Sequence, residues 1–188
     1  DRDREARRRL AFEELFMLQL QVGKRRQELQ AEPRGHFYER LEGQVEPFLE
    51  LMPFAPTGAQ GRVFREILED LGRDTPMNRL LQGDVGSGKT MVAAFAAWVA
   101  IQNGYQAALM APTEILAEQH FHKLEELLAP AGIRGGRLQG SMTKKGKLHA
   151  YELLARHELD LVVGTHALIQ EGVEFANLGM VVVDEQHK

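Results

Sequence analysis

The stretch Gly83-Asp84-Val85-Gly86-Ser87-Gly88-Lys89-Thr90 fits the pattern G-x-x-x-x-G-K-[ST] at every fixed position. Glycines let the backbone of such a loop curl, so that its N–H groups and the N-terminus of the following helix surround a polyphosphate. We expect Lys89 to reach the β- and γ-phosphates and Thr90 to place its hydroxyl on Mg²⁺. The stretch therefore predicts an ATP site with a magnesium ion. The alternative, an accidental glycine-rich turn, is disfavoured by the strand and helix predicted on either side.

Short apolar runs alternate with helical stretches on both sides of this loop. The expected strands are Arg79–Gln82, Ala107–Met110, Gly136–Leu138, Leu161–Val163 and Met180–Val183. The expected helices are Thr90–Gln102, Glu114–Leu128, about Lys147–Arg156, and an earlier one that Thr57 caps and Gly72 ends. Buried strands that alternate with helices predict an α/β fold, in which helices cover both faces of a parallel sheet.

Two acidic residues follow the last expected strand, Met180–Val183. We expect Asp184 to be the magnesium carboxylate and Glu185 to orient or deprotonate the attacking water. Adjacent carboxylates at the end of a strand are costly unless a cation lies between them. An acidic turn without function is the alternative, and the lysine loop argues against it. Lys89, Asp184 and Glu185 are thus the candidate catalytic residues.

The composition excludes several classes of protein. Of the 188 residues, 44% are hydrophobic and 27% charged, so the chain is not disordered or collagen-like. Its longest apolar run, Met91–Ile101, is shorter than the roughly 20 residues that span a bilayer. The lack of cysteine excludes disulfides, thiolate zinc sites and a cysteine nucleophile, and suits a reducing cytoplasm. A net charge of −4 excludes nucleic-acid binding by bulk attraction, so any DNA contact has to be local.

The N-terminal part of the chain differs from the rest. Residues 1–30 are predicted to form a connecting helix, because apolar residues recur at helical spacing between two basic clusters. A packed helix with solvated ends is favoured over a helix that touches a neighbouring domain or nucleic-acid phosphates. The prolines at positions 33, 47, 53 and 56 predict a linker over residues 31–56, followed by the nucleotide-binding domain over residues 57–188. Because the chain lacks an initiator Met and stops soon after a strand, we expect a segment of a longer protein.

Four segments, in order, resemble the motifs of the first motor lobe of superfamily 2 helicases. They are GDVGSGKT from Gly83, APTEILAEQH from Ala111, VVGTHALIQ from Val162 and VVVDEQH from Val181. The DEQH form and the GTHALIQ segment are most similar to the RecG branch-migration helicases of bacteria. The resemblance covers about Phe54–Lys188. It implies a RecA-like lobe of the P-loop NTPase class that uses ATP and Mg²⁺.

The resemblance also implies roles for further residues. Gln60 corresponds to the glutamine that reads adenine, an edge to which one amide can donate and accept at once; an exposed helical glutamine is the alternative. The loops that hold the nucleic-acid backbone correspond to Pro112, Thr113, Gly164, Thr165 and His166. For Thr113 a plain helix cap is an equally good interpretation. Gln186 and His187 correspond to couplers between the nucleotide site and a DNA-bound second lobe, although His187 also suits a passive surface position.

Other histidines are interpreted as structural. His120 and His122 lack the spacing of metal ligands.

Similar helicases hydrolyse ATP between two RecA-like lobes, with an arginine of the second lobe on the transferring phosphoryl group. Neither that lobe nor the family's wedge domain, an oligonucleotide-binding fold, is expected within these residues. We therefore expect this chain alone to bind nucleotide weakly and to hydrolyse it slowly.

The resemblance implies that the intact protein is an ATP-dependent double-stranded DNA translocase that remodels stalled replication forks and branched recombination intermediates. Its expected partners are branched or forked DNA, its own second lobe and wedge domain, and single-stranded-DNA-binding protein, at the nucleoid in the bacterial cytoplasm, with no membrane. Two alternatives stay open. One is the motor lobe of a transcription-repair coupling translocase, and the other is a non-catalytic lobe that docks a partner under nucleotide control.

Overall fold

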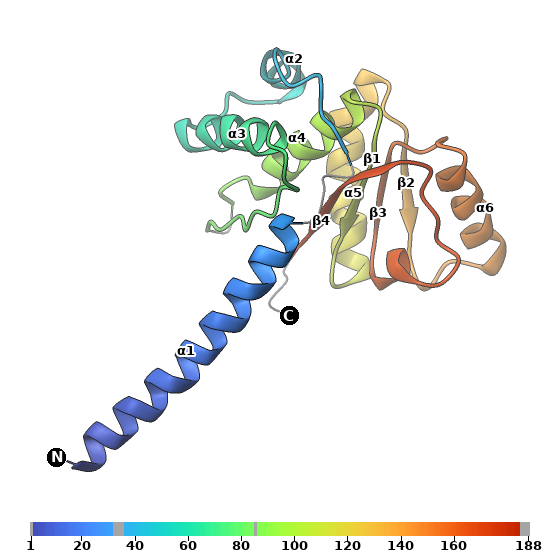
Figure 1. Ribbon diagram of the computed structural model, residues 1–188. Helices are drawn as coiled ribbons and strands as arrows, with labels where there is room; N and C mark the ends of the chain where they lie inside the picture. Colours follow the sequence, from blue (N-terminus) through green and yellow to red (C-terminus); the bar gives the residue numbers. More distant parts are fainter. Residues whose placement is uncertain (1, 32–35, 85, 185–188) are drawn as a thin grey trace.

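A four-stranded parallel sheet lies at the centre of the fold (Figure 1). The computed structural model describes residues 2–31, 36–84 and 86–184. The strands are β1 (Gln106–Met110), β2 (Gly135–Leu138), β3 (Leu161–Gly164) and β4 (Leu178–Val183). Their order across the sheet is β2-β3-β1-β4, so each connection between parallel neighbours is a crossover.

Helices cover both faces of this sheet. Helices α4 (Lys89–Gln102) and α5 (Glu114–Leu128) cover one face, and α6 (Lys144–Ala155) covers the other with the 3₁₀ turn η2 (His166–Ile169). Helix α3 (Gly58–Leu71) packs against α4, and the 3₁₀ turn η1 (Ala129–Ala131) follows α5. Successive side chains of a strand point to opposite faces. Ala107 and Leu109 of β1 accordingly pack with α4 and α5, whereas Ala108 between them packs with α6 and η2. The predicted α/β fold with both faces covered is confirmed.

One expected strand is absent. Arg79–Gln82 is irregular, and Leu80 is 71% exposed. Two adjacent leucines between polar residues carry no alternation that would direct one face into the core. Arg79 instead turns to α3, where its Nε donates to Asp70 Oδ2 at 2.8 Å and its guanidinium pairs with Glu66. The strand prediction was wrong because ion pairs with α3, rather than a sheet partner, fix this segment.

The core is centred on an aromatic cluster that joins three helices. Phe64 of α3 and Phe95 of α4 lie 4.4 Å apart between ring centroids, and Phe48 lies 5.8 and 5.2 Å from them. Phe48 belongs to α2 (Val45–Leu51), within the segment expected to be a linker. Pro47 is compatible with this helix because it occupies the first turn, where a backbone N–H has no helical partner. Residues 36–52 therefore contribute to the core of the domain.

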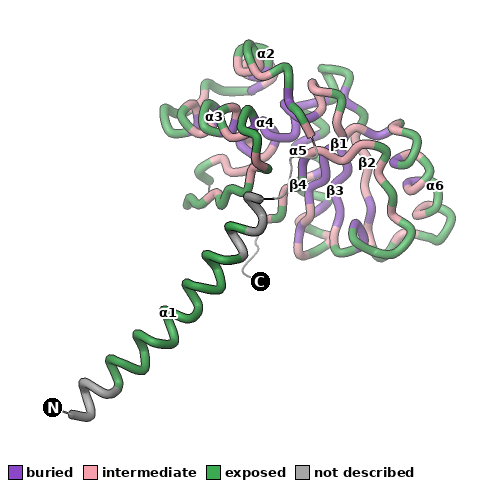
Figure 2. The backbone as a smooth tube through the Cα atoms, in the orientation of Figure 1, coloured by how far each residue is buried: buried purple, intermediate pink, exposed green. Residues whose placement is uncertain are grey.

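The N-terminal helix α1 (Arg2–Ala31) extends away from the rest of the molecule (Figures 1 and 2). Its side chains from residue 7 to 24 are all exposed, and the exposed apolar ones include Phe12 at 66% and Leu15 at 61%. The predicted helix is confirmed, but a packed helix is not what these residues show. Apolar residues between Leu10 and Val22 lie on every side of the helix, so it has no single apolar face of the kind that a surface helix directs to its own domain.

Among the residues that the structure describes, none of the helices combines the length and the apolar character that crossing a bilayer requires.

Candidate nucleotide and DNA site

The glycine-rich loop leads directly into α4 and depends on left-handed backbone at two glycines. Gly86 and Gly88 have φ angles of +82° and +83°, and Gly88 is the N-cap residue of α4. This region of φ is strained for residues with a Cβ atom. A Cβ on Gly88 would also overlap the Nε2 atom of Gln60. The fixed glycine of the motif is therefore required by its backbone, and a side chain there would also displace the Gln60 amide.

Lys89 folds back over this loop. Its Nζ atom donates to the carbonyl oxygens of Gly83 at 2.7 Å and Asp84 at 2.9 Å. A backbone hydrogen bond within the loop, from Ser87 N–H to Asp84 O at 3.1 Å, closes its turn. Thr90 is the second residue of α4, in the turn whose N–H groups have no partner within the helix. A cationic amine and free N–H groups at one helix N-terminus suit an anionic phosphate.

Gln60 lies against the loop and is only 7% exposed. It forms a capping box with Thr57, whose N–H donates to Gln60 Oε1 at 2.9 Å, and its Nε2 donates to Ser87 O at 3.0 Å. The amide retains one N–H and one lone pair beyond these contacts. The start of α3 and the phosphate loop are thus held together through one side chain.

Asp184 directly follows β4 and continues its pairing with β1, because its N–H donates to Met110 O at 2.8 Å. Its carboxylate contacts α5, where Oδ2 lies 2.7 Å from Nε2 of His120. Sequence reasoning did not identify His120 as part of the site. The two residues are 64 positions apart and share no spacing pattern, so only the fold brings them together.

Four of the sequence-predicted site residues, Val85, Glu185, Gln186 and His187, lie outside the described residues.

The two loops predicted to contact DNA leave neighbouring strands at the carboxyl edge of the sheet. Met110 at the end of β1 pairs with Gly164 at the end of β3, and Ala111 N donates to Gly164 O at 2.8 Å. Pro112 and Thr113 continue from β1, and Thr165 and His166 continue from β3. Open parallel sheets bind ligands at this edge. The structure therefore brings the two predicted segments side by side.

Each loop has a local reason for its conformation. Thr113 is the N-cap of α5 and accepts from Leu116 N at 3.3 Å, so the helix-cap interpretation holds. Its hydroxyl hydrogen is still available to a phosphate oxygen. Gly164 is buried, and a Cβ there would overlap Leu138 O on the neighbouring strand. Thr165 precedes η2 and makes no side-chain cap to it, while His166 is exposed.

A third loop is fixed to the same edge through a contact that the sequence did not suggest. Glu114, the first residue of α5, accepts from Ser141 N at 2.8 Å and from Ser141 Oγ at 2.6 Å. The hydroxyl and backbone hydrogen bonds from Ser141 lower the pKa of Glu114 below its usual value. The nearby lysines, which begin at Lys144, lie in the first turns of α6. Glu114 thus ties the loop after β2 to the start of α5.

The donor set suits Mg²⁺ held mainly by nucleotide phosphates. The Thr90 hydroxyl and the Asp184 carboxylate are oxygen donors, the type that Mg²⁺ prefers, and such ions keep several waters. Within residues 2–31, 36–84 and 86–184 no group of three or more His, Cys, Asp or Glu could form an all-protein metal site. The residues present therefore fit a nucleotide-borne magnesium ion and not a structural metal centre.

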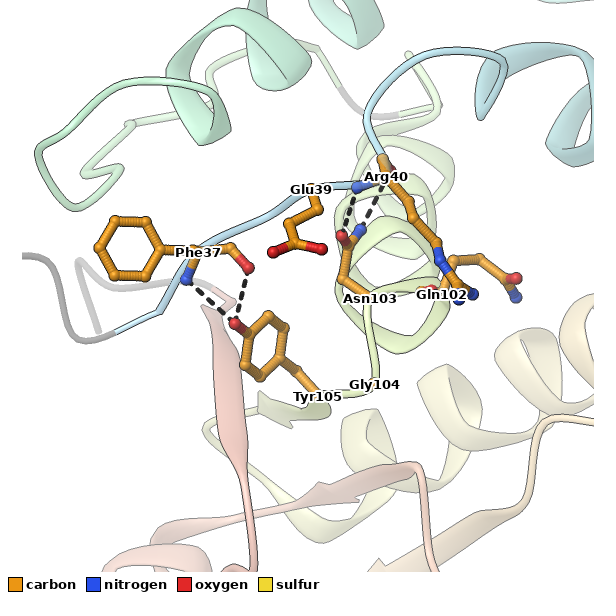
Figure 3. Close-up of a pocket in the computed structure, with 7 residues that line it drawn as sticks. All are labelled: Phe37, Glu39, Arg40, Gln102, Asn103, Gly104 and Tyr105. Carbon is orange, nitrogen blue, oxygen red and sulfur yellow. Dashed lines mark hydrogen bonds between the residues drawn. The ribbon is translucent and has the colours of Figure 1, made fainter.

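A hollow of about 390 Å³ in the described surface lies at the opposite, amino edge of the sheet (Figure 3). Tyr105 Oη donates to Phe37 O at 2.7 Å and accepts from Phe37 N at 3.0 Å. Asn103 pairs in the same way with the backbone N–H and C=O of Arg40. These contacts fasten the segment that precedes α2 to the turn before β1. The hollow is separate from the phosphate loop, which opens at the carboxyl edge.

A substitution at Gly88 tests the loop geometry. We expect Gly88→Ala to destabilise the chain by about 1–2 kcal/mol, because alanine is strained in left-handed backbone and its Cβ atom would displace the Gln60 amide. Binding of a fluorescent ATP analogue should be lost with it. Gly61→Ala is the matched control, since a Cβ there meets no atom within 4 Å inside α3, and it should stabilise by about 0.5–1 kcal/mol. Thermal unfolding and titration of the analogue measure both; equal behaviour of the two variants would contradict the geometry.

Comparison with known proteins gives the family. The DEAD/DEAH box helicase family matches residues 57–188. The ATP-dependent DNA helicase RecG of Synechocystis sp. is 50% identical over 187 residues, which are 97% of this chain and 22% of that protein. The RecG proteins of Aquifex aeolicus and Escherichia coli are 46% and 47% identical, over 96% and 97% of this chain and 23% and 26% of their own lengths.

Solved structures agree with this assignment. A structure of RecG bound to a three-way DNA junction superposes with a TM-score of 0.81 and 44% identity, over 97% of this chain and 25% of that chain. A hypothetical ATP-dependent RNA helicase from Sulfolobus tokodaii shares the fold, with a TM-score of 0.58 and 20% identity over 78% of this chain and 42% of its own. The RecA-like fold expected from the sequence is confirmed.

The chain spans about a quarter of the length of the curated relatives it matches. Its motifs, its parallel sheet and its similarity over nearly every residue agree with one another. The chain belongs to the DEAD/DEAH box helicase family, and within that family it is similar to the RecG helicases.

Proposed function

We propose that this chain is the first motor lobe of an ATP-dependent DNA helicase that acts on branched DNA. The observation that carries the proposal is the 44% identity, over 97% of the chain, to a RecG structure that holds a three-way DNA junction. Remodelling of stalled replication forks and recombination intermediates at the bacterial nucleoid is the finer form of the proposal. Single-stranded-DNA-binding protein, which would be bound to such DNA, is the proposed protein partner.

The nucleotide role rests on the phosphate loop and on Asp184. In the proposed mechanism, residues 83–90 hold the phosphates of ATP, and Lys89 exchanges its two carbonyl acceptors for β- and γ-phosphate oxygens. Thr90 and Asp184 would hold Mg²⁺, which when bound neutralises charge on the phosphates. Glu185 would orient or deprotonate the attacking water. Gln60, already fixed to Ser87 O, would read adenine with the N–H and lone pair that remain.

The DNA role rests on the loops at the carboxyl edge. Thr113 and Thr165 offer hydroxyl groups, and the first turns of α5 and η2 offer backbone N–H groups. Such donors bind phosphate oxygens without reading bases. A few of them suffice in a chain of net charge −4, because the contact is local. Pro112, Gly164 and His166 would shape the same surface.

Hydrolysis at full rate requires more than this lobe. The proposed reaction takes place between two lobes, with an arginine from the second one and with Gln186 and His187 as couplers. We therefore expect the 188-residue chain to bind nucleotide weakly and to hydrolyse little of it.

The first test measures ATP hydrolysis by the full-length protein on forked DNA, linear duplex and single strands at one salt concentration, because DNA affinity depends steeply on salt. We expect the forked substrate to stimulate hydrolysis most. Equal stimulation by plain duplex would argue for a translocase without fork preference. Hydrolysis that responds to no DNA would contradict the helicase proposal and leave only the nucleotide site.

A further inference from the structure

Helix α5 connects the carboxyl edge of the sheet, where the DNA contacts are proposed, with the proposed metal ligand Asp184. Its N-cap is Thr113, and Glu114 in its first turn holds Ser141. His120 lies seven residues after Thr113, which places the two on the same side of the helix two turns apart. The other end of this connection is Asp184, whose Oδ2 lies 2.7 Å from His120 Nε2. One rigid element therefore contacts both sites.

The contact has a defined direction. An ionised carboxylate only accepts hydrogen bonds, so Nε2 of His120 is the donor and Asp184 Oδ2 the acceptor. The side chains of His120 and Asp184 are 15% and 31% exposed, and a bond in such partly shielded surroundings is stronger than one in water. The other ring nitrogen, Nδ1, is buried and meets no hydrogen-bond partner among the described residues. The bond to Asp184 is thus the ring's one polar contact within that part of the chain.

We propose that His120 is a positioning residue for Asp184: it occupies one carboxylate oxygen and leaves the other for the magnesium ion of the bound nucleotide. Through this bond the placement of α5, which carries the proposed DNA contact at Thr113, determines the placement of the metal carboxylate. The inference rests on the proposed nucleotide function of Asp184. It assigns a link between the DNA and nucleotide sites to a residue within this lobe.

The same helix supplies a matched control. His122 lies two residues further on, with a side chain that is 57% exposed. Its nearest carboxylates, Glu118 and Glu125, lie 3.9 and 4.0 Å away, beyond hydrogen-bond distance. Replacing His122 changes the composition of α5 as much as replacing His120 does, without touching Asp184.

The experiment titrates Mg²⁺ into the full-length protein with a fluorescent ATP analogue and follows nucleotide binding. We compare wild type with His120→Ala, His120→Gln and His122→Ala. Loss of a side chain that orients a metal ligand typically weakens metal binding by at least tenfold. We expect His120→Ala to raise the Mg²⁺ midpoint roughly tenfold. His120→Gln should restore it in large part, because the glutamine amide supplies an N–H, and His122→Ala should leave it unchanged.

Two further readouts separate positioning from a general structural role. Affinity for the analogue without Mg²⁺ should be the same in all four proteins, which shows that the phosphate loop is intact. The kcat of DNA-stimulated hydrolysis should fall in His120→Ala, while the DNA concentration at half-stimulation stays constant. If His120→Ala does not fold, His120→Gln decides the question. A His120→Gln protein that folds like wild type, but whose Mg²⁺ midpoint is not restored towards the wild-type value, would overturn the proposal.

An unchanged Mg²⁺ midpoint in His120→Ala, or an equal shift in His122→Ala, would overturn the inference. Failure of the proposed function would look different, since wild type itself would then show no DNA-stimulated hydrolysis. The Mg²⁺ midpoints of nucleotide binding would decide the role of His120 in that case too.

Discussion

Replacing Lys89 with alanine in the full-length protein should reduce the kcat of DNA-stimulated ATP hydrolysis at least about a hundredfold, as loss of one preorganised donor to a developing charge typically does. Lys89 Nζ is the cation of the phosphate loop, held 2.7 Å from Gly83 O where β- and γ-phosphates are expected. Alanine leaves the backbone of α4 intact but removes that charge. Remodelling of forked DNA should be lost together with hydrolysis, and both are measured on one preparation.

Lys123→Ala provides the control for this change, because Lys123 is an exposed lysine on α5, outside residues 83–90. It should keep wild-type hydrolysis. If Lys89→Ala hydrolyses ATP within about twofold of wild type, or remodels DNA at the normal rate, the loop is not the motor site. The second of these results would support a lobe that docks partners under nucleotide control.

The largest loss of stability is expected from Phe95→Ala. Phe95 is fully buried in α4 and lies 4.4 and 5.2 Å from the rings of Phe64 and Phe48. Removing a buried phenylalanine typically costs about 3–5 kcal/mol, since burial is lost and a cavity remains. That is a large share of the roughly 5–15 kcal/mol by which a domain is stable. Urea unfolding of the 188-residue chain measures the change.

Trp98 is a built-in reporter for this experiment, because it is the chain's only tryptophan and its ring lies 6.2 Å from Phe48. Phe54→Ala is the control, since Phe54 is 52% exposed, and it should cost less than about 1 kcal/mol. Equal losses from the two substitutions would show that the aromatic cluster is not what joins α2, α3 and α4. A selective loss at Phe95 would establish that the phosphate loop leads into a helix anchored in the core.

The sequence by itself determined the α/β alternation and the ends of most elements. The short apolar runs of β1, β3 and β4 predict strands, and β1 and β3 are buried as expected. The edge strand β4 is not, because Val181 is 57% exposed. Thr57 begins α3 by local capping chemistry, which Gln60 three residues later completes. The helix ends before Gly72 as expected, although Gly72 keeps right-handed backbone with φ −78°. The glycines of the phosphate loop and its lysine are equally local, because a motif of fixed spacing carries its own geometry.

Tertiary structure decided what depends on residues far apart in the chain. Arg79 pairs with α3 instead of entering a strand, and Phe48 makes part of an expected linker into core, because ion pairs and burial outweigh local propensity. His120 meets Asp184 only because β4 lies beside β1, whose following helix is α5. Strand order brings such residues together, and no spacing along one chain encodes a distance between two strands.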